Sequence, residues 1–173
     1  MKFDALDQFI QDIARGAGRI QMDRRNAFGR ARSKSGKGDF VTEVDEACER
    51  YLIDAIRIER PNASILSEES GASGSQDAEE VWIMDPLDGT RNYVEGIPFF
   101  CVSVGMVRSG RVEAGAIYDP VHDEMFYARR GGGGVSERSR NTSFQREVAG
   151  RRPGLGRVGE AQSRAQRVRE VCG

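Results

Sequence analysis

Apolar residues recur at helical spacing in two stretches near the start of the chain. Between residues 4 and 24 they form a stripe opposite a charged face, which predicts an amphipathic helix; the stripe consists of Leu6, Phe9, Ile10, Ile13, Ala17 and Ile20. Residues 29–39 are rich in Gly, Ser, Lys and Arg and predict a loop. A second stripe follows residues 42–45 (Thr-Glu-Val-Asp), which resemble a capping box, and it ends before Pro61. We therefore expect two helices.

Short apolar runs bounded by turn residues follow the second helix. They predict strands over residues 64–66, 81–84, 99–107, 112–118 and 124–128, with an acidic surface loop over 71–79. Pro86 is expected to end the second of these strands and to start a turn, because proline has no N–H to donate to a sheet. The predicted fold class is α+β, with two N-terminal helices packed on a mainly antiparallel sheet.

The character of the chain changes after a run of glycines at residues 131–134. Residues 135–173 contain no Lys, Asp or Ile, are rich in Arg and Gly, and follow neither the helical nor the strand period. Such a segment buries too little apolar surface to offset the entropy lost on ordering. We expect a folded domain over residues 1–134 and an Arg/Gly-rich tail over 135–173 that is disordered or translated out of frame.

Composition excludes several classes of protein. The net charge of −1 favours neither a nucleic-acid nor a membrane partner, and no apolar run approaches the ~20 residues that span a bilayer. Cys48, Cys101 and Cys172 are too widely spaced for a disulfide framework or a zinc motif, which fits a cytoplasmic protein. The single histidine, His122, argues against a His-based zinc site and against a Ser-His-Asp triad.

Carboxylates gather where predicted strands end or predicted helices begin. They are Asp45, Glu68, Glu69, Asp85 and Asp88. Taken singly, each reads as a helix cap, a loop charge or a solvated turn. Together they would repel one another unless a cation were present, and hard oxygen ligands favour octahedral magnesium. Gly89 and Thr90 follow directly and offer N–H donors for a phosphate, so the pattern indicates phosphate-ester chemistry.

Four segments carry a family resemblance in the same order along the chain. Residues 85–90 (Asp-Pro-Leu-Asp-Gly-Thr) resemble the DPxDGT signature of the inositol monophosphatase family, a magnesium-dependent, lithium-sensitive phosphatase superfamily. Residues 38–45 resemble its D-x-V-T-x-x-D segment, residues 67–70 its G-E-E-S segment, and residues 92–99 its N-[FY]-x-x-G-x-P-x-[FY] segment. The resemblance covers about residues 1–134. It implies the first half of the layered αβαβα sugar-phosphatase fold.

The resemblance also implies metal ligands. Glu68 and Asp85, with the Leu87 carbonyl, would hold one magnesium ion, and Asp85 and Asp88 would contribute to a second. The complete family site holds two or three ions. Glu69 would lie near the metals as an outer acid.

Further roles concern the substrate and the attacking water. The N–H groups of Gly89 and Thr90, with Asp88, would hold the phosphate. The Thr90 hydroxyl, oriented by Asp45, would position the water, and Glu68 would assist as general base through a third, weakly bound metal. Lys34 matches a lysine on a mobile loop near the active site.

The implied activity is a phosphomonoester hydrolase that releases phosphate from a polyol or sugar phosphate, like inositol-1-monophosphatase. Alternatives are a fructose-1,6-bisphosphatase, a histidinol-phosphatase or a nucleotide 3′-phosphatase of the same superfamily, or a catalytically inactive binding or regulatory remnant. We expect a small phosphorylated substrate, no membrane or nucleic-acid partner, and a homodimer for full-length relatives. Family members are longer and carry a W-D-x-A-x-G segment that is absent here, so we expect a truncated chain that is weakly active or inactive. Without the second half, an apolar face or an edge of the sheet is expected to be exposed.

Overall fold

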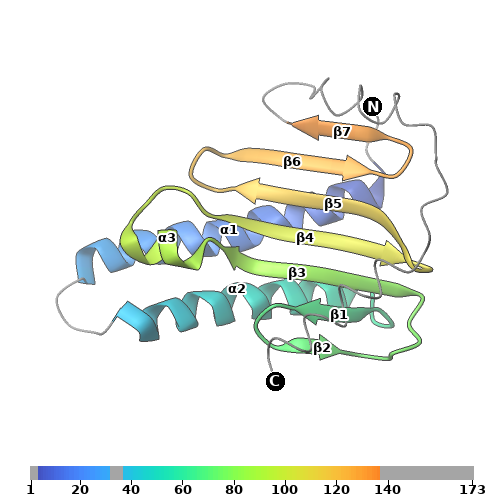
Figure 1. Cartoon of the computed structure of the whole chain (residues 1–173), viewed down its shortest axis with the longest axis horizontal. Coiled ribbons are helices and arrows are strands. Elements are labelled where there is room, and N and C mark those ends of the chain that lie inside the picture. Colours follow the sequence, from blue (N-terminus) through green and yellow to red (C-terminus); the bar gives the residue numbers. More distant parts are fainter. Residues whose placement is uncertain (1–3, 32–36, 137–173) are drawn as a thin grey trace. The chain divides into compact units, whose positions relative to one another are not determined.

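The computed structural model describes residues 4–31 and 37–136 (Figure 1). Within them, helices α1 (Ala5–Ala31) and α2 (Lys37–Glu59) precede a seven-stranded sheet of order β2-β1-β3-β4-β5-β6-β7. The strands are β1 (Ser64–Ser67), β2 (Gly71–Ser73), β3 (Glu80–Asp88), β4 (Cys101–Arg108), β5 (Arg111–Asp119), β6 (Glu124–Arg129) and β7 (Gly133–Ser136). A short helix, α3 (Thr90–Glu95), joins β3 to β4.

The sheet is mainly antiparallel, which confirms the predicted α+β class. Strands β1 and β3 run parallel, with Leu66 opposite Ile83, and the other neighbouring strands of the described sheet pair antiparallel. Strands β3 to β6 form the meander that the short apolar runs predicted. Strand β7 crosses the boundary drawn at residue 134 by two residues, and the segment after Ser136 lies outside the described residues, so the division into domain and tail stays a prediction.

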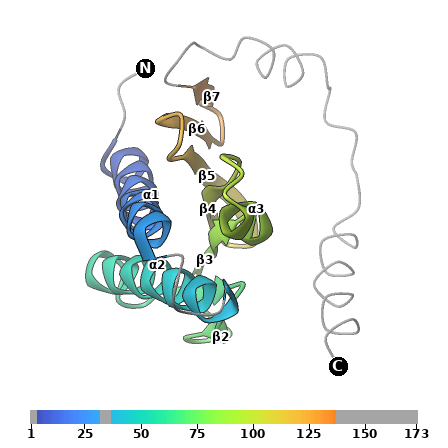
Figure 2. The same ribbon diagram turned by 90° about the vertical axis from the view of Figure 1, so that its left-hand side faces the viewer.

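One face of the sheet packs against α1 and α2, which lie on the same side of it in both views (Figures 1 and 2). Alternate strand residues point into this core, as the two-residue period of a strand requires. The largest fully buried side chains include Trp82, Ile10, Leu52, Ile56, Met106 and Met125. Phe9 of α1 meets Trp82 edge to face, with ring centroids 5.6 Å apart. The apolar stripe of α1 therefore faces the sheet as predicted.

The opposite face of the sheet is open and partly apolar. Leu66, Ile83, Ile117 and Phe126 are 39–46% exposed there. Two of the contacts across this face are direct cross-strand pairs, Leu66 with Ile83 and Ile117 with Phe126. The expected exposed apolar face is thus present on the described sheet.

Three predictions about where elements begin and end are wrong. Residues 29–31 belong to α1 and residues 37–39 to α2, so most of the predicted loop is helical, and Thr42 lies inside α2 rather than at its start. Helix formation is cooperative, and residues 29–42 contain no proline to stop it. The predicted loop over 71–79 contains β2, because Gly71, with φ of +75°, lets the chain turn back and pair with β1.

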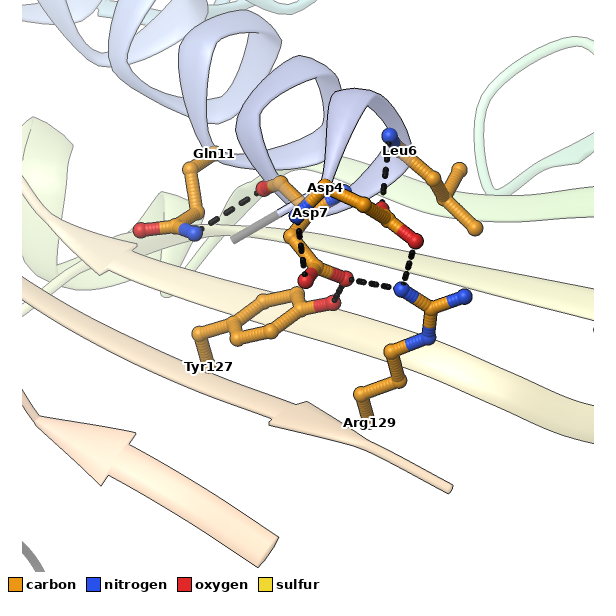
Figure 3. A network of polar contacts seen from close by, with 6 residues as sticks. All are labelled: Asp4, Leu6, Asp7, Gln11, Tyr127 and Arg129. Atoms are coloured by element: carbon orange, nitrogen blue, oxygen red, sulfur yellow. Dashed lines mark hydrogen bonds and ion pairs between the residues drawn. The ribbon is translucent and has the colours of Figure 1, made fainter. Parts of the chain in front are cut away.

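A polar network fastens the start of α1 to β6 (Figure 3). The buried Asp7 carboxylate accepts hydrogen bonds from the Tyr127 hydroxyl at 2.5 Å and from Arg129 Nη1 at 2.9 Å. Asp4 caps the helix by accepting the N–H groups of Leu6 and Asp7, and it also pairs with Arg129. Two acids and one arginine therefore fix where α1 begins on the sheet.

Within the described part of the chain, neither long helix is apolar enough over a sufficient length to cross a membrane.

Candidate active site

A β-bulge in β3 creates the central feature of the site. Asp85 lies opposite Ser103 of β4, and Asp88 lies opposite Cys101, so two residues of β3 face a single residue of β4 between these pairs. In a regular strand, residues three apart point to opposite faces. The extra residue brings Asp85 and Asp88 onto the same face of the sheet, which is the open one.

Pro86 lies within this bulge rather than at the end of the strand. Pairing resumes at Asp88, so the prediction that Pro86 ends the ladder is wrong. Proline is tolerated at bulges because its missing N–H falls where the ladder is already interrupted. The bulge is held locally by the Leu87 N–H, which donates to Asp85 Oδ1 at 3.0 Å.

Glu68 joins these two carboxylates from the neighbouring strand. Its N–H donates to the Met84 carbonyl at 3.1 Å, which extends the β1–β3 pairing by one residue and places Glu68 next to Asp85. Burial, together with the hydrogen bond and charge of Glu68, raises the pKa of Asp85 to about 7. The structure thus gathers Glu68, Asp85 and Asp88 at one corner of the open face.

Asp45 reaches the same region from α2. Its side chain is buried, and burial together with the charges of Glu69, Glu68 and Glu49 raises its pKa to about 7. The pKa of Glu69 is raised by burial and by Glu68. Asp45 Oδ1 and Ser67 Oγ are buried and have no hydrogen-bond partner among the described residues. Asp45, Glu68 and Glu69 therefore interact electrostatically, as their sequence pattern suggested.

The turn after Asp88 requires a glycine. Gly89 has φ of +91°, and a Cβ at this position would lie 3.0 Å from the Phe99 carbonyl oxygen. The Thr90 hydroxyl donates to the Leu87 carbonyl at 2.9 Å. A hydroxyl has one hydrogen, so in this arrangement Thr90 does not donate to Asp45, and the predicted orientation of Thr90 by Asp45 is not observed.

One predicted site residue lies outside the described residues, and one buried residue beside the site is not among those that the sequence predicts. Lys34 lies outside the described residues. Gln21 of α1 was not singled out, yet its Nε2 donates to the Pro86 carbonyl at 2.7 Å and to the Cys101 carbonyl at 3.3 Å. A signal was available, since Gln21 falls four residues after Ala17 on the apolar stripe.

The donor set fits a hard divalent cation in its chemistry. Carboxylates and a backbone carbonyl are the ligands that magnesium takes. Burial first, and neighbouring carboxylates after it, raise the pKa values of Asp45 and Asp85. As they stand, no three His, Cys, Asp or Glu side chains of the described ranges are spaced to hold a metal ion.

A cavity of about 260 Å³ opens beside the corner. Asp88, Gly89 and Asn92 line one side, and Phe99, Ile117 and Phe126 line the other. Burial, followed by the charge of Asp88, raises the pKa of the adjoining Cys101 thiol to about 12, so the thiol stays protonated and unreactive at neutral pH. Of the three carboxylates at the corner, Asp88 is the one that lines this cavity.

Comparison with known proteins gives a consistent result. The profile of the inositol monophosphatase family matches residues 3–166. A curated relative from Haemophilus influenzae, named Nus factor SuhB, is 40% identical over 141 residues, which cover 79% of this chain and 52% of that protein. An inositol-1-monophosphatase from Mesorhizobium japonicum is 43% identical over 101 residues, which cover 58% of this chain and 38% of that protein.

Solved structures agree with the sequence comparison. The extragenic suppressor protein suhB from Bartonella henselae superposes with a TM-score of 0.69 at 33% identity, over 79% of this chain and 53% of that one. An inositol monophosphatase from Anabaena (Nostoc) superposes with a TM-score of 0.66 at 37% identity, over 78% and 47% respectively. The chain spans about half the length of these relatives.

Proposed function

The chain belongs to the inositol monophosphatase family, and we propose that it forms one wall of a magnesium-dependent site that hydrolyses a phosphate monoester. The observation that carries the proposal is the bulge of β3, which turns Asp85 and Asp88 to the same face beside Glu68. Carboxylate oxygens are the ligands that hard divalent cations prefer, and divalent cations in turn bind phosphate.

The proposed ligands are those that the family resemblance implies for these residues. Glu68, Asp85 and the Leu87 carbonyl would hold one magnesium ion, and Asp85 and Asp88 a second. The Leu87 carbonyl already accepts the Thr90 hydroxyl, but a carbonyl oxygen has two lone pairs and one stays available. Bound magnesium would neutralise phosphate charge and acidify the attacking water.

The remaining residues would act on the phosphate and the water. The N–H groups of Gly89 and Thr90 would orient the phosphate, with Asp88 at its edge. The Thr90 hydroxyl would hold the water once it turns from Leu87 toward Asp45, and Glu68 would take up the proton that the water loses. Glu69 and Lys34 would adjust the charge around the site.

The proposed substrate is a small polyol or sugar phosphate. Support comes from the Mesorhizobium japonicum relative, which is named inositol-1-monophosphatase. Fructose bisphosphate, histidinol phosphate and nucleotide 3′-phosphates are the alternative substrates, and a panel of these esters separates them. Because relatives are about twice as long, we expect weak turnover from residues 1–173 alone.

The direct test combines magnesium binding with phosphate release. Purified chain is titrated with Mg²⁺ by calorimetry and assayed with inositol 1-phosphate, alongside Asp88→Asn and the control Asp12→Asn. Asp12 is an exposed carboxylate of α1 whose side chain accepts a hydrogen bond from Gln8 on the helix surface. We expect the site variant to lose binding and release while the control keeps both. Equal behaviour of the two variants would refute the proposed site.

A binding role is the second candidate function, because relatives from several bacteria carry the name Nus factor SuhB. In that case the chain would act through a surface rather than through turnover. An RNA-binding assay with and without residues 135–173, compared with the Asp88→Asn variant, separates the two. RNA binding that survives Asp88→Asn but is lost on deletion of the tail would favour the binding role.

A further inference from the structure

Gln21 is a fully buried amide that reaches the bulge of β3 from α1. Its Nε2 donates to the Pro86 carbonyl at 2.7 Å and to the Cys101 carbonyl at 3.3 Å. The Pro86 carbonyl lies in the bulge of β3 itself, and Cys101 is the β4 residue opposite Asp88, where pairing resumes. We propose that Gln21 is a positioning residue that holds the bulge in place and thereby sets the direction in which Asp85 and Asp88 point.

The need for such a residue follows from the chemistry of the bulge. Pro86 supplies no N–H to the ladder, and the register shifts by one residue between Asp85 and Asp88. An interrupted ladder leaves carbonyl groups that require donors from elsewhere, since a buried carbonyl without a donor is unfavourable. The two N–H groups of one Gln21 amide reach one carbonyl on each strand, so a single side chain spans the interruption.

The choice of an amide is informative because an apolar residue would pack there with less difficulty. Gln21 Oε1 is buried and has no hydrogen-bond partner among the described residues. A buried acceptor left unpaired is destabilising, whereas leucine at the same position has none. The side chain is therefore explained by its two N–H groups and not by packing.

Neighbouring contacts extend the same attachment to the far side of the turn. The Tyr93 hydroxyl of α3 donates to the Gln21 carbonyl at 2.7 Å. One helical turn further along α1, Arg25 Nη2 donates to the Gly96 carbonyl at 2.8 Å, and its guanidinium lies over the Phe100 ring at 5.2 Å. The second half of α1 thus holds both ends of the segment that contains Gly89 and Thr90.

The chain offers a matched control on the same helix. Gln11 is also buried, but its Nε2 donates to the Asp7 carbonyl of its own helix (Figure 3). Gln11→Leu and Gln21→Leu remove the same amide from the same element. Only Gln21→Leu removes donors to β3 and β4, so any effect of general helix destabilisation is shared by both variants.

Two measurements test the proposal on the full 173-residue chain. The magnesium measurement rests on the proposed function: Gln21→Leu should raise the calorimetric Kd for Mg²⁺ by about 10-fold to 100-fold, the range typical for residues that orient metal ligands, while Gln11→Leu leaves it within about twofold. Amide hydrogen exchange is independent of any ligand. Exchange at Leu87, Asp88 and Gly89 should accelerate in Gln21→Leu by at least about 10-fold relative to Gln11→Leu.

The outcomes separate the two proposals. If the unmodified chain binds no Mg²⁺, the proposed function fails, and hydrogen exchange alone decides the role of Gln21. Equal exchange at residues 87–89 in the two variants would overturn the positioning role, whether or not Mg²⁺ binds. If Gln21→Leu does not fold, Gln21→Met keeps the length of the side chain without its donors and is measured in the same way.

Discussion

Replacing the buried Asp45 carboxylate should stabilise the metal-free chain at alkaline pH. Asp45 is 4% exposed, and burial with the charges of Glu69, Glu68 and Glu49 raises its pKa from 3.8 to about 7. The folded state therefore binds more protons than the unfolded state between about pH 4 and pH 7. The contribution of protonated Asp45 to the free energy of unfolding is therefore fully present at low pH, and it is lost as the pH rises through 7.

The size of this effect follows from the difference between the two pKa values. At pH 8, ionisation of Asp45 destabilises the folded state by nearly the whole difference of about 3 pKa units, or about 4 kcal/mol. At pH 5 this destabilisation corresponds to a little over 1 unit, or about 2 kcal/mol. Asn has nearly the shape of Asp and does not ionise. The stability of Asp45→Asn relative to the unmodified chain should therefore increase by about 2–3 kcal/mol between pH 5 and pH 8.

Urea unfolding with EDTA present, followed at both pH values, measures this difference. The control is Asp12→Asn, which removes an exposed carboxylate from α1 and should show the same difference from the unmodified chain at both pH values. A difference for Asp45→Asn that does not change with pH would refute the claim that burial and neighbouring carboxylates hold Asp45 partly protonated.

Three further outcomes are expected. Tyr127→Phe removes a hydrogen bond to the buried Asp7 and should lower the free energy of unfolding by about 1.5–3 kcal/mol, more than Tyr118→Phe, whose partner is exposed; equal urea midpoints would contradict this. Gly89→Ala should destabilise the chain by about 1 kcal/mol or more beyond Gly96→Ala. Both glycines have positive φ, but of the two only Gly89 would bring its new Cβ against a carbonyl oxygen. Calorimetric melting of the two variants measures this difference, and equal Tm values would contradict it. At pH 8, Mg²⁺ at about 100 times its Kd should stabilise the unmodified chain by about 3 kcal/mol and leave Asp88→Asn unchanged; equal shifts in Tm would count against the site.

The sequence predicts the helices and strands of the core because burial imposes a period on them. Ile10 and Ile13 fall on the apolar stripe of α1, and both are buried against the sheet. Helix ends were less predictable, since cooperative extension carried α2 back to Lys37 despite a plausible cap at Thr42.

The site was predicted in its residue types but not in its geometry. Periodicity shows which face a residue takes within one strand, whereas register between strands depends on their pairing. Pro86 was therefore interpreted as a strand end, although it lies in a bulge that the partner strand defines. The two hydrogen bonds of Gln21 join it to residues that lie 65 and 80 positions away in the sequence. No local sequence pattern spans such separations.

The network around Asp7 has a consequence for the order of events during synthesis. Asp7 is synthesised 120 residues before its partner Tyr127. The anchors of α1 on β6 therefore cannot form until nearly the whole described sheet has left the ribosome. Contacts that span so much chain close slowly, because loop closure precedes any stabilisation that they provide. Helix α1 is thus translated well before its anchors on β6 can form, and its apolar face lacks part of its cover during that interval.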